Sequence, residues 1–281
     1  MQHLTPNVCT ETEFRGCNPS FVVTSEGVVL IDAPQLPLDA MKWREEILKR
    51  GSLRYLINTE PHGDHIAGNF LFPEATVVAH QGVKDRFPDS IRIIDDVRAE
   101  LEQKDPDKLW LLTSYKPHPP TITFTEKLTL YVGDHTFELV NLPGHTKPET
   151  AVYVPQERVL FTSDNVFHKV QLWLQEADPF EWLESLKKIE EFDVDFIVPG
   201  HGAVCDKLYI PEQAAFIQEW VDTVQQAIDK GISKEEAVKT ISFLDRYPMD
   251  VGLDSFGPRV QEMNVNNLWD KLVAMGEKSK S

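Results

Sequence analysis

The sequence is poor in cysteine and in long apolar runs. Three cysteines, Cys9, Cys17 and Cys205, are spread over 281 residues, and this wide spacing does not indicate a disulfide framework. No stretch approaches the roughly 18 consecutive apolar residues of a membrane-spanning helix. The first residues lack a basic stretch followed by an apolar one, so we expect no signal peptide and a cytoplasmic protein with no membrane partner.

Basic residues are also scarce relative to acidic ones. The chain has 28 Lys and Arg against 45 Asp and Glu, which gives a formal net charge of −17. Nucleic-acid binding requires clustered Lys and Arg, so we expect no nucleic-acid partner. The acidity also disfavours anionic substrates wherever no local positive charge offsets it. The 41% of hydrophobic residues and 10% of aromatic residues indicate a folded protein with a sizeable core.

Short apolar runs alternate with helical patterns, which is typical of α/β architecture. Residues 21–23 and 28–31 predict a hairpin, 39–50 a helix and 53–57 a buried strand. Residues 81–118 interrupt this rhythm with a polar, partly helical segment, which we interpret as an insertion lying over the core. Further segments follow, with strands at 121–124, 127–132, 136–140, 151–154, 158–161 and 194–198, and helices at 179–191 and about 208–275.

Residues 58–69 combine four side chains that commonly bind metals. Glu60, His62, Asp64 and His65 follow the strand at 53–57 and open a short helix, and each offers oxygen or nitrogen to a metal ion. Residues 60 and 62 can point the same way, while 64 and 65 lie on the first helical turn. The spacing therefore allows two pairs of ligands to face two neighbouring points.

Three later segments each contribute one potential ligand just beyond a predicted strand. His145 lies in a Pro-Gly-His-Thr turn, Asp164 follows the strand at 158–161, and His201 lies in a Pro-Gly-His-Gly turn. Active sites of layered α/β folds occupy such loops because the sheet holds them rigid. Together with the first motif, these residues suffice for two metal ions.

These four ordered motifs resemble the metallo-β-lactamase-fold hydrolase superfamily over about residues 20–202. The first family signature is His-x-His-x-Asp-His, and this chain departs from it by having Glu60 at the first position. The resemblance implies a four-layer αββα sandwich in a single domain over residues 1–281. The insertion at 81–118 and the C-terminal helices at about 208–275 would be additions to that core.

The resemblance also implies a ligand set for two divalent metal ions, with zinc expected first. Metal 1 would be held by Glu60, His62 and His145, metal 2 by Asp64, His65 and His201, and both by Asp164. A carboxylate in place of imidazole would lower the Lewis acidity of metal 1 and raise tolerance for Mn or Fe. The alternative is that Glu60 is a solvated loop residue and only metal 2 binds tightly.

The implied activity is hydrolysis of a small carbonyl substrate, such as a lactone, an amide or β-lactam, an ester or a thioester. A hydroxide shared by the two metals would attack the carbonyl, and Asp64 would orient the nucleophile and carry a proton as the catalytic residue. The segment after Asp164 borders the pocket in this fold, so we expect Phe167, His168 and Trp173 to contact substrate.

Other functions remain open from the sequence. Glu60 is compatible with an iron-dependent redox enzyme of the same superfamily, either a sulfur dioxygenase or an oxygen reductase. A nuclease or phosphodiesterase is disfavoured by the acidic composition, and a non-enzymatic scaffold by the near-complete ligand set. The C-terminal helices could cap the pocket or form a homo-oligomer contact.

Overall fold

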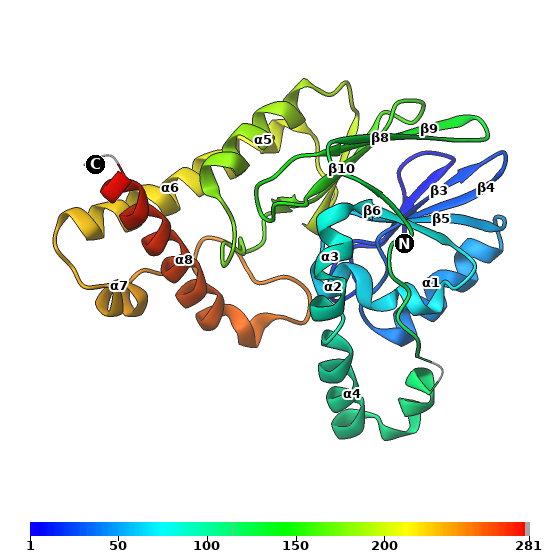
Figure 1. Ribbon diagram of the computed structural model, residues 1–281, viewed down its shortest axis with the longest axis horizontal. Coiled ribbons are helices and arrows are strands. Elements are labelled where there is room, and N and C mark those ends of the chain that lie inside the picture. The colour runs from blue at the N-terminus through cyan, green and yellow to red at the C-terminus, as the bar shows by residue number, and fades with distance from the viewer. Residues whose placement is uncertain (114, 279–281) are drawn as a thin grey trace.

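The apolar segments pair into two β-sheets in the computed structural model, which describes residues 1–113 and 115–278 (Figure 1). The first sheet has the strand order β1-β2-β3-β4-β5-β6-β7. Its strands are β1 (Gln2–His3), β2 (Val8–Thr10), β3 (Ser20–Thr24), β4 (Gly27–Ile31), β5 (Leu53–Asn58), β6 (Thr76–His80) and β7 (Ile122–Phe124). Neighbours are antiparallel up to the predicted β3–β4 hairpin and parallel from β4 to β7.

The second sheet has the order β12-β11-β10-β9-β8. Its strands are β8 (Lys127–Val132), β9 (His135–Asn141), β10 (Thr150–Val154), β11 (Val159–His168) and β12 (Phe196–Gly202). The pairs from β8 to β11 are antiparallel, and β11 and β12 are parallel. The parallel pair requires a crossover, which is supplied by α5 (Pro179–Glu191).

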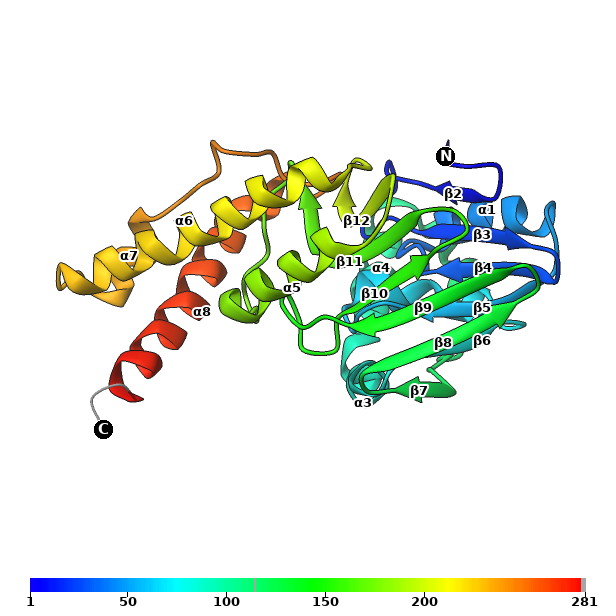
Figure 2. The same ribbon diagram turned by 90° about the horizontal axis from the view of Figure 1, so that it is seen from above.

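Helices cover the outer faces of both sheets and extend beyond them (Figure 2). In the first half they are α1 (Pro37–Leu48), α2 (Gly63–Ile66), η1 (Ala67–Leu71), α3 (Gln81–Ser90), α4 (Ile93–Lys104) and η2 (Pro106–Leu112). After α5 come η3 (Lys207–Tyr209), α6 (Ile210–Asp229), α7 (Lys234–Thr240), η4 (Asp254–Phe256) and α8 (Gly257–Lys278). Among the described residues, no helix is both long and apolar enough to cross a membrane.

Three apolar clusters join these layers. One lies between the sheets and includes Ile57 and Phe161. A second packs Trp43 of α1 against the first sheet, and a third packs Trp182 of α5 and Trp220 of α6 against the second. Each cluster removes apolar surface from water, which stabilises the fold by about 25 cal/mol for each Å² buried. The four-layer αββα arrangement expected from the sequence is therefore confirmed.

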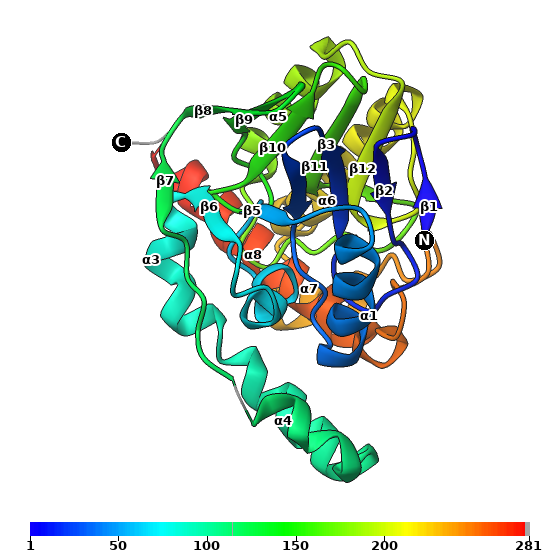
Figure 3. The ribbon, with the colours of Figure 1, turned by 90° about the vertical axis from the view of Figure 1, so that its right-hand side faces the viewer.

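The segment at 81–118 does not spread over the sandwich as a whole. Helix α3 packs beside β6, whereas α4 projects away from the sheets (Figure 3). Apolar residues of α4, including Ile94 and Val97, are buried against Phe70 of η1. The segment is therefore anchored at one end of the first sheet, close to the residues that follow β5.

Strand β11 is longer than the sequence pattern indicates. It continues to His168 and contains Asp164, and β12 contains His201, so these two residues lie within strands rather than beyond them. The pairing of β11 with β12 shifts register on both sides of Ser163, which has a positive φ of 51°. This irregularity bends the strand at the residue before Asp164 and lets that side chain face the motif of residues 60–65.

Candidate active site

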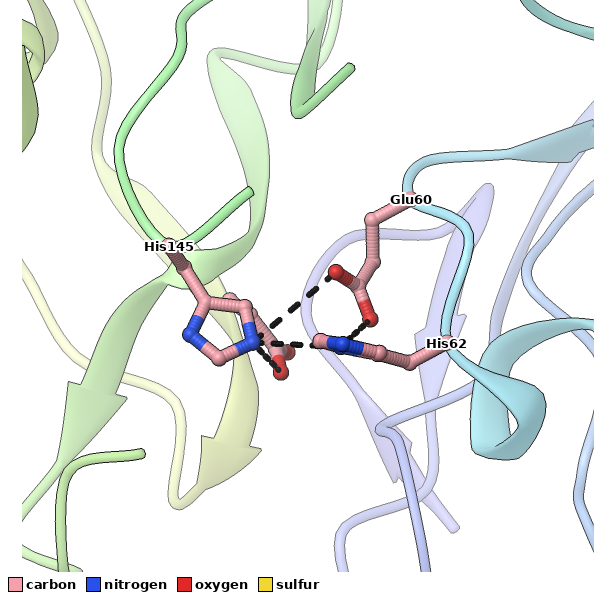
Figure 4. Close-up of side chains that lie close together, drawn as sticks. Glu60, His62 and His145 are labelled. Carbon is pink, nitrogen blue, oxygen red and sulfur yellow. Dashed lines mark hydrogen bonds and ion pairs between the residues drawn. The ribbon is translucent and has the colours of Figure 1, made fainter. Parts of the chain in front are cut away.

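The first group of predicted ligands comes together from opposite sheets. Glu60 and His62 follow β5, and His145 lies in the loop between β9 and β10. His62 Nδ1 lies 2.8 Å from Glu60 Oε1 and 3.2 Å from His145 Nε2. His145 Nε2 also lies 3.9 Å from Glu60 Oε2. Figure 4 shows the three side chains pointing toward one common point.

The second group lies beside the first. Asp64 and His65 are on α2, and His201 is on β12. Asp64 Oδ2 lies 3.3 Å from His201 Nε2 and 3.9 Å from His65 Nε2. These three residues have ligand atoms close enough together to hold one ion.

Asp164 stands between the two groups. Its Oδ1 lies 3.2 Å from His65 Nε2. Its Oδ2 lies 3.5 Å from His145 Nε2 and 3.4 Å from His201 Nε2. The structure therefore brings all seven predicted ligand residues together, with Asp164 in the shared position.

The donor set fits divalent metal ions. Both carboxylate oxygens of Glu60, Nε2 of His65 and Oδ1 of Asp164 are buried and lack a hydrogen-bond partner among the described residues, and the 2.8 Å contact of Glu60 with His62 lacks hydrogen-bond geometry. Buried charged groups without partners are costly unless they are paired or coordinate a metal. Imidazole nitrogen and carboxylate oxygen are ligands that Zn and neighbouring divalent ions accept.

Three of the imidazole rings are held by a protein acceptor at the nitrogen that faces away from the centre. Nδ1 of His65 lies 2.9 Å from Asp32 Oδ2. Nδ1 of His201 lies 2.8 Å from Asp250 Oδ2, and Nδ1 of His145 lies 2.7 Å from the carbonyl oxygen of Trp173. Such contacts fix the tautomer and direct Nε2 to the centre. Asp32 and Asp250 were not recognised from the sequence, because each is distant in the chain from the histidine that it holds.

His62 has the opposite orientation. Its Nδ1 faces the centre, and its Nε2 contacts Glu176, which accepts two hydrogen bonds of 2.9 Å from Arg86 of α3. Although partial burial opposes it, contact with His62 and Arg86 lowers the pKa of Glu176 to about 2. The 81–118 segment therefore supports a proposed metal ligand through Arg86.

The buried charges shift the pKa of the ligand imidazoles. Burial lowers the pKa of His62, His65 and His201, but nearby carboxylates outweigh burial and raise all three well above the usual value. In His145 burial prevails, and its pKa is lowered. Burial also raises the pKa of Asp164, but His201 and His65 outweigh it and hold this pKa well below its usual value. The centre thus stabilises ionised carboxylates next to imidazoles.

Close packing fixes Asp164. Its backbone N–H donates to Glu149 Oε1 at 2.9 Å, and Glu149 Oε2 accepts from the hydroxyl of Thr146 at 2.9 Å. On the other side, a Cβ at Gly200 would lie 1.9 Å from Asp164 Oδ1. A glycine is therefore required next to Asp164 because any side chain would displace the carboxylate.

A cavity of about 600 Å³ opens onto the centre. Its walls come from the N-terminal loop, the 81–118 segment and the C-terminal segment as well as from the core. It is lined by Arg15, Gly16, Gln35, His62, Gly63, Asp64, Ile93, Asp96, Glu100, His145, Asp164, Trp173, Gln175, His201, Leu253, Phe256 and Arg259. The two segments outside the core thus shape the space next to the proposed metal ligands.

The three residues expected to contact substrate take different positions. Trp173 lines the cavity, whereas Phe167 and His168 do not. Phe167 is buried and stacks on the His201 ring, with centroids 5.1 Å apart and an interplanar angle of 9°. His168 Nδ1 contacts the carbonyl oxygen of Ala203 at 2.8 Å. Phe167 therefore packs behind the proposed ligand His201, and substrate contact stays a prediction for all three.

Curated relatives match parts of the chain. The Beta-lactamase-like protein 2 homolog of Caenorhabditis elegans is 23% identical over 158 residues, or 56% of this chain, and the chain spans only 44% of that relative. The Metallo-beta-lactamase type 2 of Elizabethkingia meningoseptica is 26% identical over 230 residues, covering 78% of this chain and 81% of that protein.

A solved metallo-beta-lactamase family protein from Thermus thermophilus has the same fold. It aligns over 98% of this chain and 95% of its own, with a TM-score of 0.66 at 17% identity. The sequence model of the Metallo-beta-lactamase superfamily matches residues 12–201, which include all seven proposed ligand residues. The chain therefore belongs to the metallo-beta-lactamase superfamily.

Proposed function

We propose that this chain is a hydrolase with a two-metal centre, in which Asp164 is shared by both ions. Metal 1 would be held by Glu60, His62 and His145, and metal 2 by Asp64, His65 and His201. The observation that carries this proposal is the environment of Glu60, whose side chain is 0% exposed and whose two oxygens receive no hydrogen bond from residues 1–113 and 115–278. A solvated loop carboxylate would instead point into water.

Asp64 is the proposed catalytic residue. Two divalent ions bound here would polarise a carbonyl and lower the pKa of a shared water. Asp64 lines the cavity and is 22% exposed, so it can reach a substrate while it contacts His201. Burial raises its pKa, but His65 and His201 outweigh burial and lower it. Asp64 is therefore ionised near neutral pH, so it can accept a hydrogen bond from a nucleophile and orient it; we propose that it also carries the proton released in the reaction.

The proposed substrate is a small carbonyl compound, such as a lactone, an ester, a thioester or a β-lactam. A volume of about 600 Å³ falls within the range of about 300–1,000 Å³ that is common for small-molecule sites. Trp173, Leu253 and Phe256 provide apolar wall, and the buried Oε1 of Gln175 lacks a hydrogen-bond partner in the described part of the chain. Such a site would accept an apolar body and position it with a few polar groups.

Metal analysis tests the two-metal centre. Zinc-loaded protein should contain two ions per chain after dialysis, and Glu60→Ala should retain one. Glu157→Ala is the matched control, because Glu157 also contacts a histidine, His135 at 2.8 Å, but does not line the cavity. A single tightly bound ion that is unaffected by Glu60→Ala would refute the two-metal centre. The zinc-loaded protein is then assayed against lactones, β-lactams, esters, thioesters and phosphodiesters.

Glu60 also favours a second candidate, an iron-dependent redox activity. With Glu60, Asp64 and Asp164 the centre has three carboxylates, and oxygen ligands suit harder ions better than thiolates do. Iron-loaded protein that consumes oxygen in the presence of a persulfide, while zinc-loaded protein hydrolyses none of the panel, would support the redox activity. Zinc-dependent turnover of a carbonyl substrate would support the hydrolase.

A further inference from the structure

Two arginines line the cavity of a strongly acidic protein. Arg15 lies between β2 and β3, and Arg259 lies in the first turn of α8. Both border the same cavity as His62 and Asp64. Because the chain has a net charge of −17, its long-range field repels anions. Cationic side chains next to the proposed metal centre are therefore a local exception to the charge of the molecule.

Arg15 is held on two sides and has a donor to spare. Its Nη1 donates to Glu100 Oε2 at 2.7 Å, and a Cβ at Gly252 would lie 3.2 Å from its Cδ, so the side chain packs against that turn. Its Nε is buried and has no hydrogen-bond acceptor within the described ranges. Buried N–H groups are normally satisfied by protein, water or ligand. Because Nε itself is buried, a bound anion would instead meet the exposed part of the Arg15 side chain, which is 23% exposed and borders the cavity.

Arg259 keeps its charge available. It is exposed, and no carboxylate of residues 1–113 and 115–278 forms an ion pair with it. In contrast, Arg158 and Arg246 on the surface each pair with acidic side chains. An unpaired guanidinium that borders a cavity can bind a carboxylate through two parallel hydrogen bonds.

The charge balance of the cavity supports the same conclusion. Two divalent ions would offset the three carboxylates of the proposed metal centre. The other charged side chains that line the cavity are Arg15, Arg259, Asp96 and Glu100, and Glu100 also accepts a hydrogen bond of 2.9 Å from Lys104. Arg15 and Arg259 match Asp96 and Glu100 in number, so with two divalent ions and a shared hydroxide bound the cavity would be close to neutral, in contrast to the acidic molecule around it.

We propose that Arg15 and Arg259 form an anion subsite that selects substrates with a carboxylate remote from the scissile carbonyl. This inference rests on the proposed hydrolase function. Apolar walls from Ile93, Trp173 and Phe256 lie in the same cavity. The preferred substrate would thus combine a reactive carbonyl at the metals, a short apolar spacer and a terminal carboxylate.

Matched substrate pairs test the subsite. The mono-4-nitrophenyl esters of adipic and suberic acid have a terminal carboxylate, and the corresponding esters of the monoamides have a neutral end of similar size. For the zinc-loaded protein, we expect kcat/KM to be at least about tenfold higher for the acids, as charge-assisted hydrogen bonds would give. Equal kcat/KM for acid and amide at both chain lengths would overturn the proposal.

Variants identify the source of this preference. Arg259→Gln and Arg15→Gln should lower kcat/KM by a larger factor for the acids than for the amides. Glu100→Gln should raise kcat/KM for the acids by freeing Nη1 of Arg15. Arg98→Gln is the charge-matched control, because Arg98 lies on α4 but does not line the cavity. A preference that persists in both Arg15→Gln and Arg259→Gln would overturn the subsite. If Arg15→Gln does not fold, the Arg259→Gln result decides.

Product binding separates the subsite from the hydrolase activity. Calorimetry compares adipate with adipamate on the zinc-loaded protein, since both can place one carboxylate at the metals and only adipate has a second. The subsite is supported if adipate binds more tightly than adipamate and this difference disappears in Arg259→Gln. This holds even if no ester is hydrolysed, and in that case only the proposed function fails. Equal affinities for adipate and adipamate would overturn the subsite even if the esters are turned over.

Discussion

The Nδ1 atom of His201 lies 2.8 Å from Oδ2 of Asp250, and both side chains are buried. His201 lies in β12 within the superfamily core, whereas Asp250 lies between α7 and α8. The C-terminal segment is further attached through Gln171, whose backbone N–H donates to the carbonyl oxygen of Pro248 at 2.9 Å. The segment after residue 202 therefore reaches the proposed metal centre and supports one of its ligands.

Removing this hydrogen bond to His201 should weaken zinc binding at the position of metal 2. Asp250→Ala leaves the His201 ring without its hydrogen-bond partner, so we expect zinc affinity at metal 2 to fall by about 10- to 100-fold. Asp250→Asn should restore part of this loss, because the amide oxygen can still accept from Nδ1. Competition with a chromophoric chelator measures the affinity.

Asp245→Ala is the control for this series, since Asp245 lies in the same segment and is exposed. Unchanged zinc affinity in Asp250→Ala would show that the contact does not position His201.

Gly200→Ala should disrupt the site by steric conflict. Its Cβ would lie 1.9 Å from Asp164 Oδ1 and 2.7 Å from the carbonyl carbon of Ser163. We expect loss of zinc binding and a decrease of about 1–3 kcal/mol in the free energy of unfolding, measured by urea denaturation of metal-free protein. Gly276→Ala is the control, since within the described residues a Cβ there would meet nothing within 4 Å apart from its chain neighbours and the backbone of its own helix. In that helix alanine should not destabilise, and equal effects of the two changes would contradict the steric explanation.

Asp64→Asn should separate catalysis from folding. The amide has the shape of the carboxylate but cannot accept a proton, so we expect kcat on a substrate of the wild-type protein to fall by about 100-fold or more. Steady-state kinetics at matched zinc content measures this loss. Asp95→Asn, on the exposed face of α4, should keep wild-type kcat. Full activity of Asp64→Asn would exclude Asp64 as the catalytic residue.

The pH dependence of stability should reverse when metal is bound. The pKa values of His62, His65 and His201 are raised in the metal-free fold. Their contribution to stability is complete below about pH 6.5, the usual pKa of histidine, and is lost as pH rises through the raised values. The free energy of unfolding of metal-free protein should therefore fall between pH 6 and 9, as judged by urea denaturation.

Zinc should produce the opposite trend over the same range, because protons compete with the metal for the imidazoles. Zinc affinity should thus increase from pH 6 to pH 8. A metal-free protein whose stability rises across this range would contradict the raised pKa values.

Much of the fold, and the proximity of the seven proposed ligand residues, could be predicted because they depend on local patterns. The helix expected at residues 39–50 is α1 (Pro37–Leu48), and the strand expected at 53–57 is β5 (Leu53–Asn58). The four residues of the first motif lie within six consecutive positions of the chain, so their spacing alone indicates a shared site. Hydrophobic periodicity and residue spacing of this kind can be recognised from the sequence alone.

The groups behind the ligands could not be predicted in the same way. Asp250 is 49 residues from His201, and Glu176 is 114 residues from His62. Neither acidic residue belongs to a motif, and each resembles the many surface carboxylates of this chain. The strands β1 and β2 were also missed, because they are two and three residues long and show no usable alternation. The roles of these acidic residues and the formation of these short strands depend on tertiary contacts, which the sequence pattern does not reveal.

The distribution of the ligands between the two sheets has a mechanical consequence. Glu60, His62, Asp64 and His65 follow a strand of the first sheet, while His145, Asp164 and His201 belong to the second. Each bound ion would cross-link the two sheets across the seam between them, because its ligands come from both halves of the sandwich. Pulling the halves apart would then require rupture of coordination bonds. Metal-loaded molecules should therefore withstand a higher unfolding force than stripped ones, with the difference concentrated at this seam.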